Sequence, residues 1–145
     1  IMDISIAVSL CMFFEGFRAR PFLCPAGVAT IGYGTIRYPD GSPVTLFDDP
    51  ITKIQAKKLL IHQLKTDYVP VVLRLVQNLT LSQLNACIDF AYNLGNSALQ
   101  HSTFRRKLNS GDIVGARIEI MRWVYGGGKR LSGLVARRQQ ERDLL

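Results

Sequence analysis

The chain has 145 residues, of which 48% are hydrophobic and 20% are charged, and its formal net charge is +7 at pH 7. This composition is typical of a globular protein and excludes a disordered or fibrous chain. The length allows one domain that buries roughly 70% of the surface of the unfolded chain without disulfide or metal staples.

The cysteines and the apolar segments exclude several kinds of protein. Cys11, Cys24 and Cys87 cannot all pair, and none belongs to a C-x-x-C motif, so we expect neither a disulfide framework nor a zinc site, and a reducing compartment fits best. The apolar segment 4–14 is too short and wrongly flanked to span a membrane. The sequence therefore predicts no cofactor, no bound metal and no stable membrane insertion.

The positive charge is concentrated near the C-terminus. Residues 101–145 hold ten basic and four acidic side chains. Such a field attracts polyanions in general, whether nucleic acid, anionic membrane or an acidic cell-wall polymer, and a solvated surface explains it equally well. Since the sequence contains no motif that reads bases, we do not expect a nucleic acid partner.

The first 50 residues predict one helix and a small β region. Asp3 caps a helix that runs to about Phe14, and Gly16 and Pro21 end or bend it. Glycines and prolines recur through residues 22–49, around the β-prone segment 28–36. We predict a small hairpin or β-lobe here.

Helix signals dominate the remaining chain. Thr52 with Gln55 forms a capping box that begins a connecting helix over about 52–77, which Pro70 kinks or ends. A second box at Thr80 begins a helix over 81–93, and Gly95 closes it. Further helices follow, separated at 111–112 and 126–128. The chain is thus predicted to be one α+β domain, mainly helical, in which a small antiparallel β-lobe (about 1–50) joins a helical lobe (about 80–145). A ligand is expected in the cleft between them.

Glu15 is the first candidate for chemistry. It lies at the end of an apolar helix, where partial burial raises the pKa of a carboxyl, and a carboxyl that is protonated near neutral pH can donate a proton to a leaving group. The alternative is a helix-end glutamate paired with Arg18 or a distant arginine. In the segment 30–34, one hydroxyl and two glycines allow a ligand to approach the backbone closely.

Three motifs that follow one another along the chain resemble those of one family. Glu-Gly-x-Arg begins at Glu15, Cys-Pro-x-Gly-Val begins at Cys24, and Thr-Ile-Gly-Tyr-Gly begins at Thr30. Together they resemble the signature of the phage-type lysozymes, glycoside hydrolase family 24. Similarity continues through the Asp-Phe-Ala-Tyr-Asn-Leu-Gly segment at 89–95 and the C-terminal segment 123–141, and it implies a two-lobed lysozyme-like fold.

The resemblance also implies a reaction and its residues. Family members cleave the β-1,4 bond between N-acetylmuramic acid and N-acetylglucosamine in peptidoglycan. Glu15 matches the general acid and Thr30 the threonine that helps to place the attacking water. Cys24 stands where most members have an aspartate, within a Cys-Pro-Ala-Gly variant of the motif. Three hypotheses follow: Cys24 acts as the base, it attacks the sugar, or it is a spectator.

Other residues receive lesser roles. The resemblance makes Tyr92, Asn93 and Arg117 candidate contacts to the sugar, although core packing explains Tyr92 almost as well. Asp89 lies within a helix, where a salt bridge is the favoured interpretation. One of three arginines is expected to hold Glu15 by a charge-assisted hydrogen bond, namely Arg130, Arg137 or Arg138.

The sequence therefore predicts a muramidase of the endolysin type that lyses the bacterial cell wall at the end of phage infection. The alternative is a catalytically silent relative that only binds peptidoglycan. By analogy we expect a monomer that accumulates in the host cytoplasm and reaches the wall in the periplasm with the help of a holin.

Overall fold

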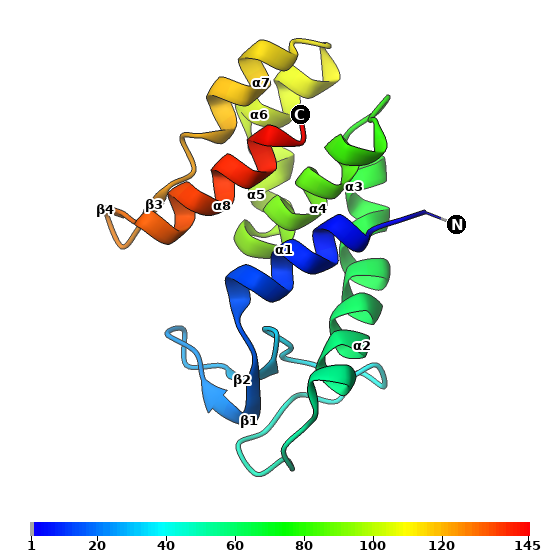
Figure 1. Ribbon diagram of the computed structural model, residues 1–145, viewed down its shortest axis with the longest axis vertical. Helices are drawn as coiled ribbons and strands as arrows, with labels where there is room; N and C mark the ends of the chain where they lie inside the picture. The colour runs from blue at the N-terminus through cyan, green and yellow to red at the C-terminus, as the bar shows by residue number, and fades with distance from the viewer. Residues whose placement is uncertain (1) are drawn as a thin grey trace.

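A computed structural model describes residues 2–145 and places a small β-hairpin beside a group of helices (Figure 1). The N-terminal part contains α1 (Ser5–Glu15), β1 (Arg18–Leu23) and β2 (Ala29–Gly32). The elements that follow are α2 (Lys53–Gln63), η1 (Leu64–Tyr68), α3 (Val69–Leu75), α4 (Leu81–Leu94), α5 (Asn96–His101), α6 (Thr103–Asn109), α7 (Ile113–Ile120), β3 (Tyr125–Gly126), β4 (Lys129–Arg130) and α8 (Ser132–Asp143). The predicted α+β class, mainly helical with a small antiparallel β part, is confirmed.

The two predicted capping boxes form. Thr52 and Thr80 each accept a hydrogen bond from the backbone N–H three residues later, and the glutamine side chain at that position accepts one from the threonine N–H. The prediction that Asp3 caps the first helix is wrong: Ile4 is the N-cap of α1 without a side-chain cap, and the Asp3 carboxylate accepts a hydrogen bond from the Ser5 N–H at 2.9 Å just before the helix. Gly16, at φ +73°, ends α1 and turns the chain into β1.

Pro70 neither kinks nor ends its helix abruptly. The chain passes from α2 through the π-helical segment η1 into α3, and the Val69 N–H donates to the Leu64 carbonyl five residues earlier. A proline has no N–H and its ring crowds the preceding turn, and a widened turn accommodates both effects. The irregular turn lies directly before the proline for this reason.

Two antiparallel hairpins make up the β structure. β1 pairs with β2, and the register shifts between Arg18 and Phe22. Pro21 lies inside this irregular stretch, where the lack of an N–H is tolerated. β3 pairs with β4 around Gly127 and Gly128, whereas the sequence predicted only a break in the chain at this point.

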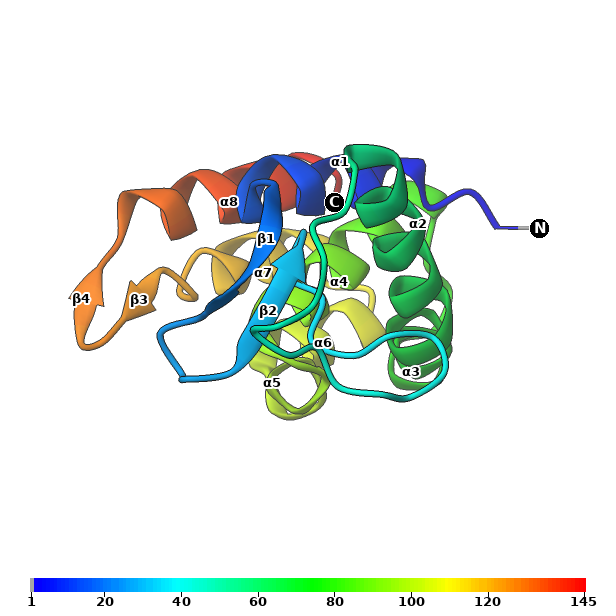
Figure 2. The ribbon, with the colours of Figure 1, turned by 90° about the horizontal axis from the view of Figure 1, so that it is seen from below.

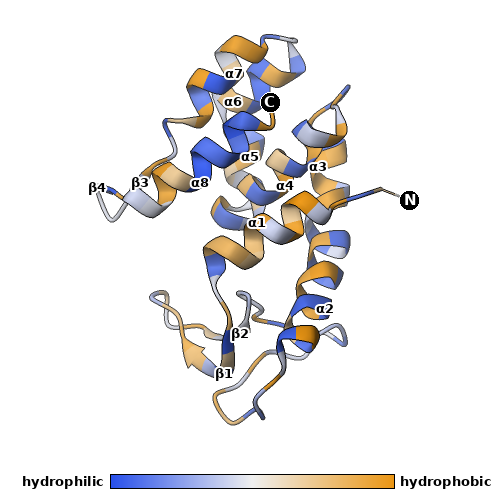
Figure 3. Cartoon of the chain, viewed as in Figure 1, coloured by the Kyte–Doolittle hydropathy of each residue, from blue (hydrophilic) through white to orange (hydrophobic). Residues whose placement is uncertain are grey.

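Helix α4 lies at the centre of the helical part, and α1 and α8 both pack against it (Figures 1 and 2). All eight residues from Leu84 to Ala91 are buried. The Asn85 side chain ties α4 to α1 by accepting a hydrogen bond from the Ala7 N–H at 2.8 Å. Figure 3 shows a contrast between the apolar α1 and the largely hydrophilic α8 beside it, although α8 buries Arg137, Arg138 and Glu141.

A hydrogen bond and two glycines join the β part to the helices. The Tyr92 hydroxyl on α4 donates to the Tyr33 carbonyl at 2.7 Å. Gly34, at φ +94°, lies so close that an added Cβ would be 2.8 Å from the Tyr92 hydroxyl oxygen. An added Cβ on Gly32 would lie 3.1 Å from the Ala56 side chain on α2. The β part is thus positioned by close contacts that admit no larger side chain.

We predict that Gly34→Ala lowers the free energy of unfolding by about 2–4 kcal/mol, because it adds both a left-handed backbone strain and a clash. Gly41→Ala is the matched control, since Gly41 has φ +88° and an added Cβ there meets nothing within 4 Å; it should lose only about 1 kcal/mol. Urea unfolding measures both values. Equal losses, or no relief of the Gly34→Ala loss by Tyr92→Phe, would contradict the proposed clash.

Candidate active site

Glu15 lies where the helical part meets the β part. It is the last residue of α1, and its side chain is 27% exposed. The carboxyl borders a pocket of about 450 Å³. The pocket is lined by Phe14, Glu15, Asn93, Leu131, Ser132, Gly133, Leu134 and Arg137.

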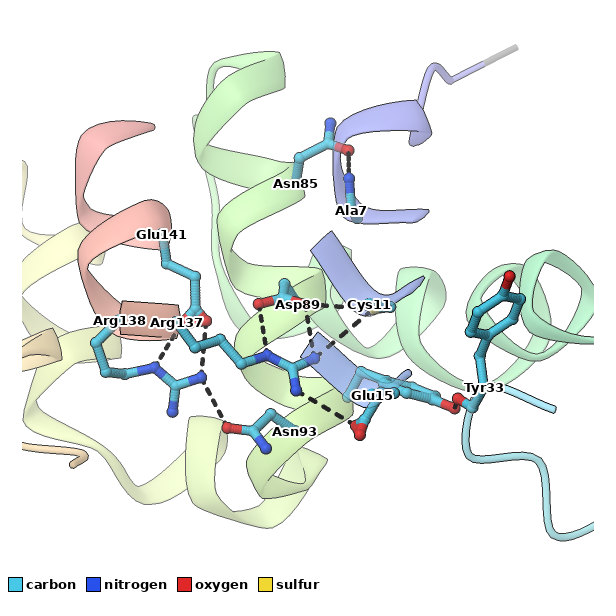
Figure 4. Close-up of polar contacts among 11 residues, drawn as sticks. Ala7, Cys11, Glu15, Tyr33, Asn85, Asp89, Asn93, Arg137, Arg138 and Glu141 are labelled. Carbon is cyan, nitrogen blue, oxygen red and sulfur yellow. Dashed lines mark hydrogen bonds and ion pairs between the residues drawn. The ribbon is translucent and has the colours of Figure 1, made fainter. Parts of the chain in front are cut away.

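Arg137 on α8 is the arginine that holds Glu15. Its guanidinium donates to a Glu15 carboxylate oxygen at 3.3 Å. It also binds Asp89 on α4 through two hydrogen bonds, of 2.8 and 3.0 Å. Figure 4 shows this guanidinium between the two carboxylates. Of the three arginines that the sequence proposed for Glu15, the structure selects Arg137.

Burial in the pocket raises the pKa of Glu15 above its ordinary value, and the ion pair with Arg137 offsets this only in part. Asp89 adds a further small rise through the repulsion between two carboxylates. Glu15 therefore keeps its proton to a higher pH than a solvated glutamate does. This agrees with the pKa shift predicted from its place at the end of an apolar helix.

A second buried ion pair lies beside the first. Arg138 and Glu141 on α8 are both fully buried, and the Arg138 Nε lies 2.6 Å from the Glu141 carboxylate. The same guanidinium donates to the Asn93 side-chain oxygen at 2.8 Å (Figure 4). Asn93, which the sequence proposed as a sugar contact, thus lines the pocket, and its side chain is positioned by Arg138.

Cys24 and Thr30 lie together on the β1–β2 hairpin, and neither is among the residues that line the Glu15 pocket. Cys24 follows β1 directly, and its carbonyl and N–H close the turn by bonding to Gly27 and Val28. Hydrogen bonds from the backbone N–H groups of Val28 and Ala26 have the largest effects that lower the pKa of the Cys24 thiol. Thr30 is buried, and its hydroxyl donates to the Val28 carbonyl at 2.9 Å.

The other two proposed sugar contacts have structural partners. The hydroxyl of Tyr92 is occupied by the Tyr33 carbonyl, so this residue joins the β part to α4. Arg117 lies on α7 and donates to the carbonyl of Leu145 at the C-terminus. Among the described residues, Arg117 does not line the Glu15 pocket.

The structure confirms the salt bridge predicted for Asp89, which it forms with Arg137. Cys11 is buried, and its thiol also donates to Asp89 at 3.3 Å. One sequence signal pointed to this cluster: Asn85, Asp89 and Asn93 recur every four residues in an otherwise apolar helix, which places three polar side chains on one buried face. Within residues 2–145, no three His, Cys, Asp or Glu side chains gather as a metal site requires.

Asp48 is an acidic residue of the β part that is engaged within its own loop. It accepts hydrogen bonds from the Thr45 hydroxyl and N–H and from the Tyr38 hydroxyl, so it shapes the preceding loop. Asp40 is likewise engaged by Ser42 in the predicted turn.

The model of the phage lysozyme family matches residues 12–141, and the chain belongs to this family. It is 37% identical over 145 residues to an endolysin of Bacillus phage B103, covering 99% of this chain but only 54% of that protein. The chain thus spans about half the length of that relative. In the described residues, no helix is long and apolar enough to cross a membrane.

Solved structures show the same fold. An endolysin from Escherichia coli O157:H7 phage FAHEc1 superposes with a TM-score of 0.86 at 34% identity, covering 99% of this chain and 92% of that one. The muramidase domain of SpmX from Asticaccaulis excentricus gives a TM-score of 0.84 at 29% identity and covers 99% and 97% of the two chains. The fold expected from the sequence motifs is therefore shared over nearly the whole chain.

The raised pKa of Glu15 predicts how stability depends on pH. The folded protein binds the Glu15 proton more tightly than the unfolded chain does, so this group loses stability as pH rises through its raised pKa. Glu15→Gln removes that loss, because an amide does not titrate. We expect Glu15→Gln to gain stability relative to the parent between pH 4 and pH 7, as measured by urea unfolding.

In the same experiment, the stability of Asp40→Asn relative to the parent should change with pH in the opposite direction. Hydrogen bonds from the Ser42 side chain and N–H lower the pKa of Asp40, so its contribution is present above its ordinary pKa and lost in acid. Asp40→Asn should therefore lose stability relative to the parent as pH rises. A pH-independent difference for Glu15→Gln would contradict the raised pKa.

Proposed function

We propose that this protein is a muramidase of the endolysin type, which hydrolyses the β-1,4 bond between N-acetylmuramic acid and N-acetylglucosamine in peptidoglycan. The observation that carries the proposal is the Glu15 carboxyl at the mouth of a pocket, partly buried and with a raised pKa. Membership of the phage lysozyme family supports it. The names of the similar proteins, endolysin and muramidase domain, agree with this activity.

In the proposed reaction, Glu15 gives its proton to the glycosidic oxygen as the bond to the sugar breaks. A carboxyl that retains its proton near neutral pH is suited to this step. Arg137 then stabilises the carboxylate that remains, because its guanidinium already lies 3.3 Å from the Glu15 oxygen. Asn93 and the segment 131–134 line the space in which a sugar would lie.

We assign the second function of a glycosidase to Cys24. As a thiolate it would take a proton from the attacking water, with Thr30 helping to place that water. The lowered pKa of Cys24 supports this role, and the carboxylates of Asp40 and Asp48 are already engaged within the β part. A direct attack of the thiolate on the sugar, giving a thioglycosyl intermediate that water then hydrolyses, is the competing route.

We further propose that the protein acts on the wall in the periplasm as a monomer. It would accumulate in the host cytoplasm and depend on a holin-type partner that permeabilises the membrane. The basic surface of residues 101–145 supports attraction to the carboxylates of wall peptides, since long-range attraction between opposite charges speeds encounter.

Glu15→Gln is expected to lower the release of new reducing ends from purified peptidoglycan by about 10²–10⁴-fold, because it removes the proton donor. Asp143→Asn is the matched control: it makes the same change of charge at an exposed carboxyl on α8 and should keep parental activity. Circular dichroism verifies folding. If the folded parent binds walls but releases no reducing ends, the silent peptidoglycan-binding alternative replaces the proposal.

Substitution of Cys24 tests the second group through the pH profile. Activity needs Glu15 protonated and Cys24 ionised, so the pKa values of both groups shape the pH profile. Cys24→Asp should extend activity to lower pH, since aspartate ionises near a pKa of about 3.9. Cys24→Ser should lose activity by about 10²-fold or more.

The profiles separate the three hypotheses for Cys24. Parental profiles in both variants identify a spectator. An active Cys24→Asp variant whose activity extends to lower pH supports the base. A covalent sugar adduct on Cys24, trapped by acid quench and found by mass spectrometry, supports nucleophilic attack.

A further inference from the structure

Titratable side chains from four elements surround Glu15. Cys11 lies on α1, Asp89 and Tyr92 on α4, Tyr68 on η1 and Arg137 on α8. Burial raises the pKa of Cys11, Tyr68 and Tyr92, so these three groups stay neutral near pH 7. Arg137 and Asp89 are therefore the pair whose charges act directly on Glu15.

Arg137 is shared unequally between its two carboxylates. It makes two hydrogen bonds to Asp89, of 2.8 and 3.0 Å, but one of 3.3 Å to Glu15. Asp89 is fully buried and Arg137 is 3% exposed, whereas the Glu15 side chain is 27% exposed. A bidentate pair in a site of low dielectric is the stronger of the two interactions.

The buried cluster holds more carboxyl groups than guanidinium groups. Glu15, Asp89 and Glu141 face two guanidiniums, those of Arg137 and Arg138, and Arg138 pairs with Glu141. Two positive charges neutralise two carboxylates, so the cluster is neutral when one carboxyl carries a proton. Burial raises the pKa of Glu141 against the pull of Arg138. Glu15 has the longest ion pair of the three carboxyls, at 3.3 Å against 2.8 Å for Asp89 and 2.6 Å for Glu141, and it borders the pocket.

We propose that Asp89 is a positioning residue that commits the Arg137 guanidinium to itself, so that Glu15 keeps the proton it delivers. The Cys11 thiol, which donates to Asp89 at 3.3 Å, helps to hold this carboxylate in place. Without Asp89, the full charge of Arg137 would act on Glu15 and ionise it. The inference deepens the proposed function and rests on the role of Glu15 as the acid.

The test follows the carboxyl carbon of Glu15 by ¹³C NMR from acid to alkaline pH in the parent and in Asp89→Asn. We expect the titration midpoint of Glu15 to fall by about one pH unit or more in Asp89→Asn, the effect of an unshared cation nearby. The rate of peptidoglycan hydrolysis above this midpoint should fall by up to about tenfold for each unit of the shift, because less Glu15 carries its proton. A midpoint that stays or rises overturns the inference.

Ile88→Ala separates charge from packing, because Ile88 is a fully buried residue on the same helix. It should destabilise the protein but leave the Glu15 midpoint unchanged. A shift in Ile88→Ala equal to that in Asp89→Asn would show that loosened packing, and not the charge of Asp89, moves the proton, and would overturn the inference.

A double variant keeps the test decisive if Asp89→Asn does not fold. Asp89→Asn with Arg137→Gln removes both charges and keeps a polar amide at each position. Because Asp89 already neutralises most of the charge of Arg137, the Glu15 midpoint should stay within about one unit of the parent. A rise of more than about one unit would show that Arg137 acts mainly on Glu15, and would overturn the inference.

The NMR titration does not depend on catalysis, so the two proposals fail separately. If Glu15 titrates as expected but the parent releases no reducing ends, the muramidase proposal fails and the electrostatic role of Asp89 stands. If the parent digests peptidoglycan but Asp89→Asn leaves the Glu15 titration unmoved, the muramidase proposal stands and the inference about Asp89 fails.

Discussion

The guanidinium of Arg137 is buried where three helices meet, and the arrangement of the site depends on it. It reaches Asp89 on α4 and Glu15 at the end of α1, 122 residues away in the chain. A guanidinium removed from water is strongly unfavourable unless its N–H groups find acceptors, so α8 can occupy this position only if both other helices supply carboxylates. A helix that looks hydrophilic in Figure 3 is therefore built into the protein by its charges.

The residues of the proposed active site come from two halves of the protein. Glu15 and Arg137 belong to the packed helices, whereas Cys24 and Thr30 belong to the β1–β2 hairpin. Close contacts join the halves: the turn at Gly16, the Tyr92 hydroxyl on the Tyr33 carbonyl, and Gly32 against Ala56. The position of Cys24 relative to the proton on Glu15 thus depends on small residues that let the backbone approach the helices.

Local signals in the sequence predicted most helix boundaries, because a capping box or a terminal glycine acts within four residues. The boxes at Thr52 and Thr80 are examples. The π-helical turn before Pro70 was missed because its geometry depends on how the chain packs on both sides. The β3–β4 hairpin was missed because two-residue strands carry no periodicity. The choice of Arg137 among three arginines depends on a contact between chain ends, which spacing alone does not determine.

The cysteine at the position of the usual aspartate gives the buried charges a wider significance. In a site with two carboxyls, the negative charge of one raises the pKa of the other and helps it to stay protonated. A thiol supplies this help only once it is ionised, and here it lies on the separate hairpin. Under the proposed mechanism, the negative charge that counteracts Arg137 comes from Asp89, inside the helical core. Glu15 then keeps its proton because of a charge within the packed helices, whatever the ionisation state of Cys24.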